Sequence, residues 1–136
     1  MVTVSPKMEK PLPPGMPGCL KKRRLLNEKE LSPDLCREYG EKFLAMEWWE
    51  DALEFFQKGN YQEGLEKIKA HCLESGDAFL LGRLGKDWDP DLWRQVAERA
   101  LALGKVQFAR RALEMAGDKK KAAALGPEAA GEQTLH

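Results

Sequence analysis

Apolar residues recur along most of this chain at the three- and four-residue steps of an amphipathic helix. The first series, Leu35, Tyr39 and Phe43, follows a Ser-Pro step at residues 32–33. A serine N-cap with proline at the first helical position is a frequent start of a helix. The pattern therefore predicts an amphipathic helix over residues 33–46.

Further apolar series predict six more helices, each bounded by glycine, proline or a capping residue. They cover residues 48–58, 61–75, 79–84, 90–103, 106–116 and 119–125. The helix over 79–84 is weakened by Gly82 and Gly85, because glycine is a poor helix former. No stretch alternates apolar and polar residues for long enough to predict a sheet. We therefore expect an all-α protein of about six or seven helices.

The ends of the chain differ in composition from this helical stretch. Residues 1–18 are rich in proline and are followed by the basic run Lys21-Lys22-Arg23-Arg24. Proline removes backbone donors and blocks helix, so we expect a disordered Pro/Lys-rich arm over residues 1–31. The helical-repeat domain should then span residues 32–126, with a flexible tail over residues 127–136.

Two stretches repeat the same order of elements. A tryptophan, Trp48 or Trp93, opens the first helix of each stretch, and a glycine ends that helix. A second helix, a Gly-Asp pair and a short helix then follow. With the two tryptophans aligned, the matched positions are Ala52 with Ala97, Phe55 with Ala100, Gly59 with Gly104, Gly64 with Ala109, and Ile68 with Leu113.

Each stretch resembles a tetratricopeptide repeat, with an aromatic residue at the fourth position, small residues at the eighth and twentieth, and a turn glycine at the fifteenth. The match covers residues 48–72 and 93–117. The longer helical repeats of vesicle-coat and ciliary-transport proteins are similar, as a second choice. Both resemblances imply a short right-handed α-solenoid of antiparallel helical hairpins that binds other proteins. An array with so few repeats has little capping, so self-association or assembly into a larger complex is also an expectation.

Charge and cysteine content narrow the functional classes. The chain has 22 basic and 22 acidic residues, so no net charge draws it to nucleic acid or to a membrane surface. No apolar run reaches the length of a membrane span, and the amino-terminal residues lack the apolar core of a secretory signal. Three scattered cysteines fit free thiols in a reducing compartment. We expect a cytoplasmic protein, with a nuclear location as an alternative.

Candidate chemistry is sparse. His71 and Cys72 are the only adjacent metal-type ligands, and no second pair lies at a zinc spacing. Neighbours on a helix point about 100° apart, so Cys72 is a poor nucleophile partner for His71. Carboxylates surround Trp48 and are spaced like a solvated helix face: Glu47, Glu50, Asp51 and Glu54. We therefore expect no catalytic residue, cofactor or metal.

The sequence thus favours a non-enzymatic adaptor or scaffold that binds a helix or an extended peptide of another protein. The candidate partner contacts are Trp49, Phe56, Trp88 and Arg94. Trp88 lies in a loop between aspartates, where it either plugs a seam between repeats, which we favour, or anchors a partner.

The alternative function is an accessory factor that binds nucleic acid or an anionic surface through basic patches. The residues of these patches are Lys21, Lys22, Arg23, Arg24, Lys119, Lys120 and Lys121. In a chain without net charge, a single short basic run is more often a solvated linker, so we expect nucleic acid not to be the main partner.

Overall fold

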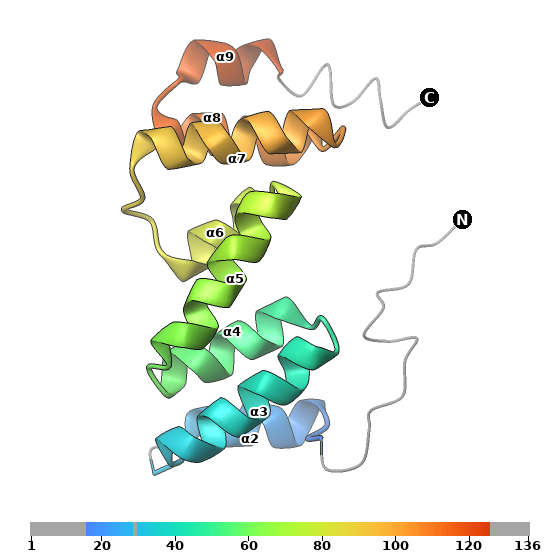
Figure 1. Ribbon diagram of the computed structural model, residues 1–136, viewed down its shortest axis with the longest axis vertical. Coiled ribbons are helices and arrows are strands. Elements are labelled where there is room, and N and C mark those ends of the chain that lie inside the picture. Colours follow the sequence, from blue (N-terminus) through green and yellow to red (C-terminus); the bar gives the residue numbers. More distant parts are fainter. Residues whose placement is uncertain (1–15, 29, 126–136) are drawn as a thin grey trace, which may run out of the picture. The chain divides into compact units, whose positions relative to one another are not determined.

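The computed structural model describes residues 16–28 and 30–125, and these residues form eight helices and no strand. The expectation of an all-α protein is confirmed for this part of the chain. The chain divides into two compact units, Met1–Glu66 and Lys67–His136, each with its own packed helices (Figure 1).

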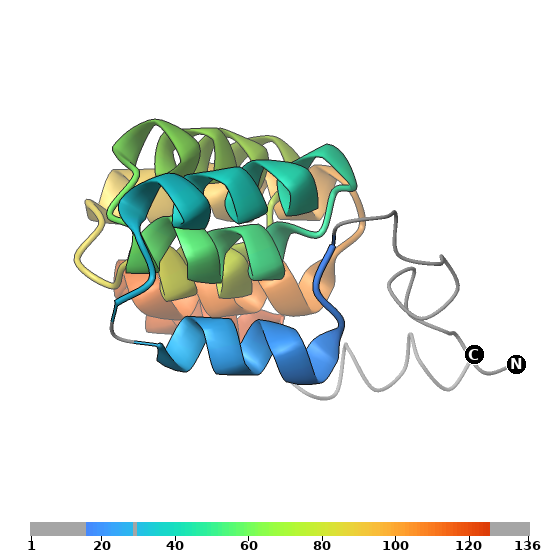
Figure 2. The ribbon, with the colours of Figure 1, turned by 90° about the horizontal axis from the view of Figure 1, so that it is seen from below.

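The first unit is built on a hairpin of α3 (Pro33–Ala45) and α4 (Trp49–Lys58). A third helix, α2 (Cys19–Asn27), lies on the α4 side of this hairpin (Figure 2). The first turn of α5 (Gln62–Ser75) completes the unit. Aromatic rings form its core.

The ring of Phe43 stacks on the rings of Trp48 and Phe55, with centroid separations of 5.6 and 5.7 Å. Phe56 contacts two glycines: a Cβ added to Gly40 or Gly64 would lie 2.3 or 2.7 Å from its ring. These glycines therefore make room for the buried ring of Phe56.

The second unit contains the rest of α5, α6 (Ala78–Leu84), α7 (Pro90–Ala102), α8 (Val106–Ala116) and α9 (Lys119–Ala124). Helices α7 and α8 form a hairpin, and both α6 and α9 pack against α8. Trp93 of α7 is buried in the core. Gly76, at the end of α5, approaches α7 so closely that an added Cβ would lie 2.7 Å from the Cα of Ala100.

All of the helices predicted from residue 32 onward are present, with ends that differ by a residue or two. Helix α2 corrects the prediction of a disordered arm, because it lies inside residues 1–31. Its apolar residues form no regular series, so the periodicity gave no signal for it. The predicted disorder of residues 1–15 and the predicted tail from residue 127 lie outside the described residues.

The turns that follow α3, α4, α5, α7 and α8 share one backbone conformation. One residue in each turn has a positive φ: Glu47, Asn60, Gly76, Gly104 and Gly117. The next N–H then donates to the carbonyl five residues earlier, as Trp48 does to Phe43, Tyr61 to Phe56, Asp77 to Cys72, Lys105 to Ala100, and Asp118 to Leu113. This is the hydrogen bond of a Schellman motif, which satisfies carbonyls that the helix end leaves without a partner.

Superposing these turns gives the alignment of the two hairpin sequences. Residues 32–60 match residues 89–117, and the shared residues are Pro-Asp-Leu, an arginine, a glutamate, Leu-Ala and an alanine. Trp48 therefore matches Lys105, whose backbone angles are nearly the same (φ −90°, ψ 75° against φ −93°, ψ 75°). Trp93 matches Cys36.

The alignment of Trp48 with Trp93 is wrong, because Trp48 precedes α4 in a turn whereas Trp93 lies inside α7. Both side chains are nevertheless buried, since 9% of Trp48 and 1% of Trp93 is exposed.

Candidate functional site

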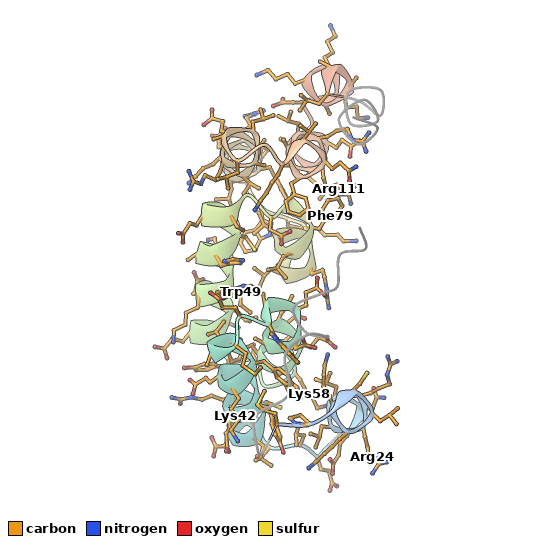
Figure 3. All side chains as sticks on the ribbon, turned by 90° about the vertical axis from the view of Figure 1, so that its right-hand side faces the viewer. Arg24, Lys42, Trp49, Lys58, Phe79 and Arg111 are labelled. Atoms are coloured by element: carbon orange, nitrogen blue, oxygen red, sulfur yellow. The ribbon has the colours of Figure 1, made fainter. Side chains whose placement is uncertain are left out.

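The four predicted partner contacts occupy different environments. Phe56 is completely buried, so its assignment as a partner contact is wrong. Its size and position suit the core instead, since it fills the space left by two glycines. Trp49 is half-buried at the start of α4 (Figure 3), and Arg94 is exposed on α7.

Trp88 is half-buried and is anchored within the second unit. Its indole Nε1 donates a hydrogen bond of 3.0 Å to the carbonyl of Leu81 on α6. The ammonium of Lys69 lies 5.0 Å from the centre of its ring. Trp88 therefore fastens the loop between α6 and α7 to the second unit. Only part of its ring is exposed to solvent.

The basic run of α2 does not act as one free patch. The Lys22 ammonium contacts the carboxylate of Asp51 and lies 3.1 Å from that of Glu54. Burial disfavours the charged ammonium, but hydrogen bonds and the charges of both carboxylates outweigh burial and raise the pKa of Lys22. Arg24, by contrast, extends into solvent (Figure 3).

Asp51 also corrects the prediction of a fully solvated acidic face on α4. Only 4% of Asp51 is exposed, because α2 covers it and supplies Lys22 as its counter-ion. A buried carboxylate needs such a partner, and the periodicity of α4 alone did not show that a second helix would provide it.

One cleft of the second unit brings together Arg94 and Lys121, two of the predicted site residues. We call it the α7–α9 cleft; its volume is about 350 Å³. Its lining consists of Arg94, Ala97, Glu98, Leu101, Leu113, Asp118, Lys121, Ala124 and Leu125. It is thus a mainly apolar cleft with charged residues among its lining.

Arg94 is held in place by two carboxylates. Its Nε lies 2.8 Å from Oδ2 of Asp118, and its Nη1 lies 2.7 Å from Oδ1 of Asp91. The hydrogen bond from Arg94 lowers the pKa of Asp118, and the bonds to Asp118 and Asp91 raise the pKa of Arg94. The cation is therefore fixed beside the cleft, with its charge balanced by the protein itself.

The matching place in the first unit is filled. Phe56, which matches Leu113, occupies the space between Gly40 and Gly64. The guanidinium of Arg37, which matches Arg94, lies 4.9 Å from the centre of the Tyr61 ring and pairs with Glu41 of its own helix, not with an aspartate. A larger apolar side chain thus closes in the first unit the groove that stays open in the second.

A second cleft lies on α8 and α9, and we call it the α8–α9 cleft. Its volume is about 570 Å³. Its lining consists of Arg110, Arg111, Glu114, Met115, Lys119, Ala122 and Ala123. The predicted patch Lys119–Lys121 is therefore divided: Lys119 lines this cleft, Lys121 lines the α7–α9 cleft, and Lys120 lines neither.

The thiols of Cys36 and Cys72 are buried, whereas that of Cys19 is exposed. Burial raises the pKa of Cys72 to about 12 and raises that of Cys36 as well. Neither buried thiol forms a useful amount of thiolate at neutral pH, so neither is suited to nucleophilic chemistry. Within residues 16–28 and 30–125, no group of three or more His, Cys, Asp or Glu residues is arranged to hold a metal ion.

None of the helices in the described segments is both long and apolar enough to cross a membrane. Comparison with known proteins gives no match to a protein-family model, to a curated protein or to a solved structure.

Proposed function

We propose that this chain is a non-enzymatic adaptor or scaffold of the cytoplasm, built as a short right-handed α-solenoid, that binds a segment of another protein. The open α7–α9 cleft is the observation that carries the proposal. The same groove is closed by Phe56 in the first hairpin, so the opening reflects a difference in side chains and not the general looseness of a helical pair.

The spacing of small residues supports a tetratricopeptide-like array. If each hairpin is counted from the proline that begins it, Gly40 and Ala97 fall at the eighth position and Ala52 and Ala109 at the twentieth. Ala52 and Ala109 are completely buried. Small residues at these positions let paired helices approach closely, and stacked helical pairs commonly bind extended or helical segments of other proteins.

The chemistry of the cleft fits a peptide with an apolar side chain between polar neighbours. Leu101, Leu113 and Leu125 supply apolar surface, and 45% of Leu101 remains exposed. Arg94 and Lys121 supply donors, and Glu98 supplies an acceptor. An apolar anchor among polar groups is the usual anatomy of a protein-binding surface.

The sharpest test uses two leucines that are equally exposed. Leu101 lines the cleft, whereas Leu103, which is 44% exposed, follows α7 and does not line it. Tagged parent, Leu101→Glu and Leu103→Glu proteins are used to capture partners from native lysate, in parallel with and without nuclease. We expect specific proteins to be captured by the parent and by Leu103→Glu and to be lost with Leu101→Glu, while thermal unfolding of both variants stays similar.

Equal capture by all three proteins would show that the cleft does not bind the partner. If the captured proteins disappear whenever nuclease is added, the alternative accessory function at nucleic acid is favoured instead. The engagement of Lys22 by Asp51 and Glu54 argues against that alternative, because it removes one of the four charges of the amino-terminal run.

A further inference from the structure

The α8–α9 cleft carries an unbalanced positive charge. Three of its lining residues are cationic, namely Arg110, Arg111 and Lys119, and Glu114 is the one acidic residue among them. Arg111 and Glu114 form only a weak ion pair within α8: Nη1 of Arg111 lies 3.9 Å from Oε1 of Glu114, and each side chain is 47% exposed. Arg111 extends outward from α8 (Figure 3).

The other lining residues of the same cleft are apolar. Met115 and Ala123 line it beside Ala122, which is almost completely buried. Methionine adapts its shape to a bound apolar side chain. A ligand that fits must therefore offer carboxylates to the cationic side chains and an apolar group to Met115 and the alanines.

The lining does not suit a nucleic acid. No aromatic side chain lines the cleft, so no base could stack there. A nucleic-acid backbone also needs a continuous track of cations, whereas Lys120 and Lys121 lie outside this cleft. The charge is confined to one compact cleft.

From this combination we propose that the α8–α9 cleft binds an acidic peptide segment of a partner protein, with carboxylates at Arg110, Arg111 and Lys119 and an apolar side chain against Met115. The recognition is by charge complementarity, which sets specificity and the rate of association more than raw affinity. This site is separate from the α7–α9 cleft and does not depend on a partner being bound there.

The purified full chain is tested by fluorescence anisotropy with a short labelled peptide of glutamate and leucine. The matched probe replaces every glutamate with glutamine, and a single-stranded RNA oligonucleotide is the third probe. We expect the acidic peptide to bind and the glutamine peptide not to bind. Added salt should weaken the binding, because the charges of the cleft are exposed to solvent.

Three charge reversals locate the site. Lys119→Glu and Arg111→Glu should each weaken binding of the acidic peptide about fivefold, because an attraction is lost and a repulsion of similar size replaces it. Lys120→Glu makes the same change in net charge on the same helix, but outside the cleft, and should change binding by less than about twofold. A glutamate in the first turn of α9 also favours the helix dipole, so unfolding would not explain the loss.

Equal weakening by Lys119→Glu and Lys120→Glu would overturn the proposal, because it would show a general effect of charge and no defined site. Failure of the parent protein to bind the acidic peptide would also overturn it. Tighter binding of the RNA than of the peptide, lost in Lys119→Glu, would assign the cleft to nucleic acid instead.

Discussion

The hairpins formed by residues 32–60 and 89–117 have the same backbone plan but distribute their core volume differently. The first places aromatic rings at Phe43, Phe55 and Phe56, where the second has Ala100, Ala112 and Leu113. The second places its one fully buried aromatic side chain, Trp93, where the first has Cys36. The capped Pro-Asp start, the turn conformations and the alanine at Ala52 or Ala109 are shared, so the backbone plan resides in those positions and the bulk is free to move.

The difference in volume also explains the difference in surface. Phe56 closes its groove in the first hairpin and requires glycines at Gly40 and Gly64. Leu113 is smaller, its neighbours are Ala97 and Lys121, and the groove stays open. Differences at three matched positions, Gly40 and Ala97, Phe56 and Leu113, and Gly64 and Lys121, thus separate a filled core from a candidate binding cleft.

The largest expected effect is at the matched positions Trp93 and Cys36. Trp93→Ala should lower the free energy of unfolding by about 3–5 kcal/mol, because a buried aromatic side chain is replaced by a cavity. Cys36→Ala removes little more than one buried sulfur and should cost about 1 kcal/mol. Urea titrations followed by circular dichroism measure both.

Trp93→Phe is the control that separates the loss of the indole N–H group from the loss of side-chain volume. The indole Nε1 of Trp93 has no hydrogen-bond partner among the described residues, so losing it should cost little beyond volume. Similar losses for Trp93→Ala and Cys36→Ala would contradict the view that the two hairpins concentrate their bulk at different positions.

The next effect concerns the groove itself. Gly40→Ala should destabilise the first unit by about 1–3 kcal/mol, because the new methyl group would overlap the ring of Phe56. Gly40→Ala combined with Phe56→Leu recreates the Ala97–Leu113 pair of the second hairpin. In that background the alanine should be neutral or slightly stabilising, giving a coupling of about 1 kcal/mol or more in a double-mutant cycle.

Ala97→Gly serves as the control, since it should cost about 1–2 kcal/mol through helix propensity and the loss of one buried methyl group. Additive losses for Gly40→Ala and Phe56→Leu would mean that the ring does not determine which groove is closed.

The helices were predictable because their signals are local. Ser32-Pro33 and Asp89-Pro90 begin helices by capping, and the hydroxyl of Ser32 does accept the predicted type of bond, from the N–H of Leu35 at 3.1 Å. Helix α2 was not predictable in this way. Its clearest contact is tertiary, from Lys22 to Asp51 and Glu54, which lie far along the chain.

The site was only partly predictable for the same reason. Arg94 and Lys121 could be chosen as exposed charged residues, but their shared cleft depends on how α9 lies against α8. Phe56 was misassigned because the sequence pattern of a helix rich in apolar residues is the same whether an aromatic side chain faces a partner or packs against two glycines. The correct alignment was missed because Glu47 replaces the expected glycine in a turn with positive φ.

That turn provides the third prediction, which contrasts two residues at one position. Glu47 has φ 62° and its match Gly104 has φ 75°. Glu47→Gly should stabilise the chain by about 1 kcal/mol, because it relieves a side chain from the left-handed region. Gly104→Ala should destabilise it by a similar amount, through the backbone alone, since no atom lies within 4 Å of the added Cβ.

Thermal unfolding measures both changes. A result of the same sign for the two variants would show that the turns are not equivalent despite their shared hydrogen bonds.

The smallest effect distinguishes the two arginine contacts by pH. Arg94 pairs with Asp118 across two elements and lowers its pKa, whereas the matched Arg37 lies over the Tyr61 ring and pairs only with Glu41 of its own helix. Any stability from Arg94–Asp118 is therefore present above about pH 4, the ordinary range of an aspartate, and is lost as the pH falls through the lowered pKa of Asp118. A carbon-detected NMR titration should show the Asp118 carboxyl titrating below its usual range. Arg94→Gln should return the pKa of Asp118 toward the ordinary value, whereas Arg37→Gln should leave the pKa of Asp118 unchanged. An unchanged pKa of Asp118 in Arg94→Gln would mean that the pair contributes nothing to holding that edge of the α7–α9 cleft.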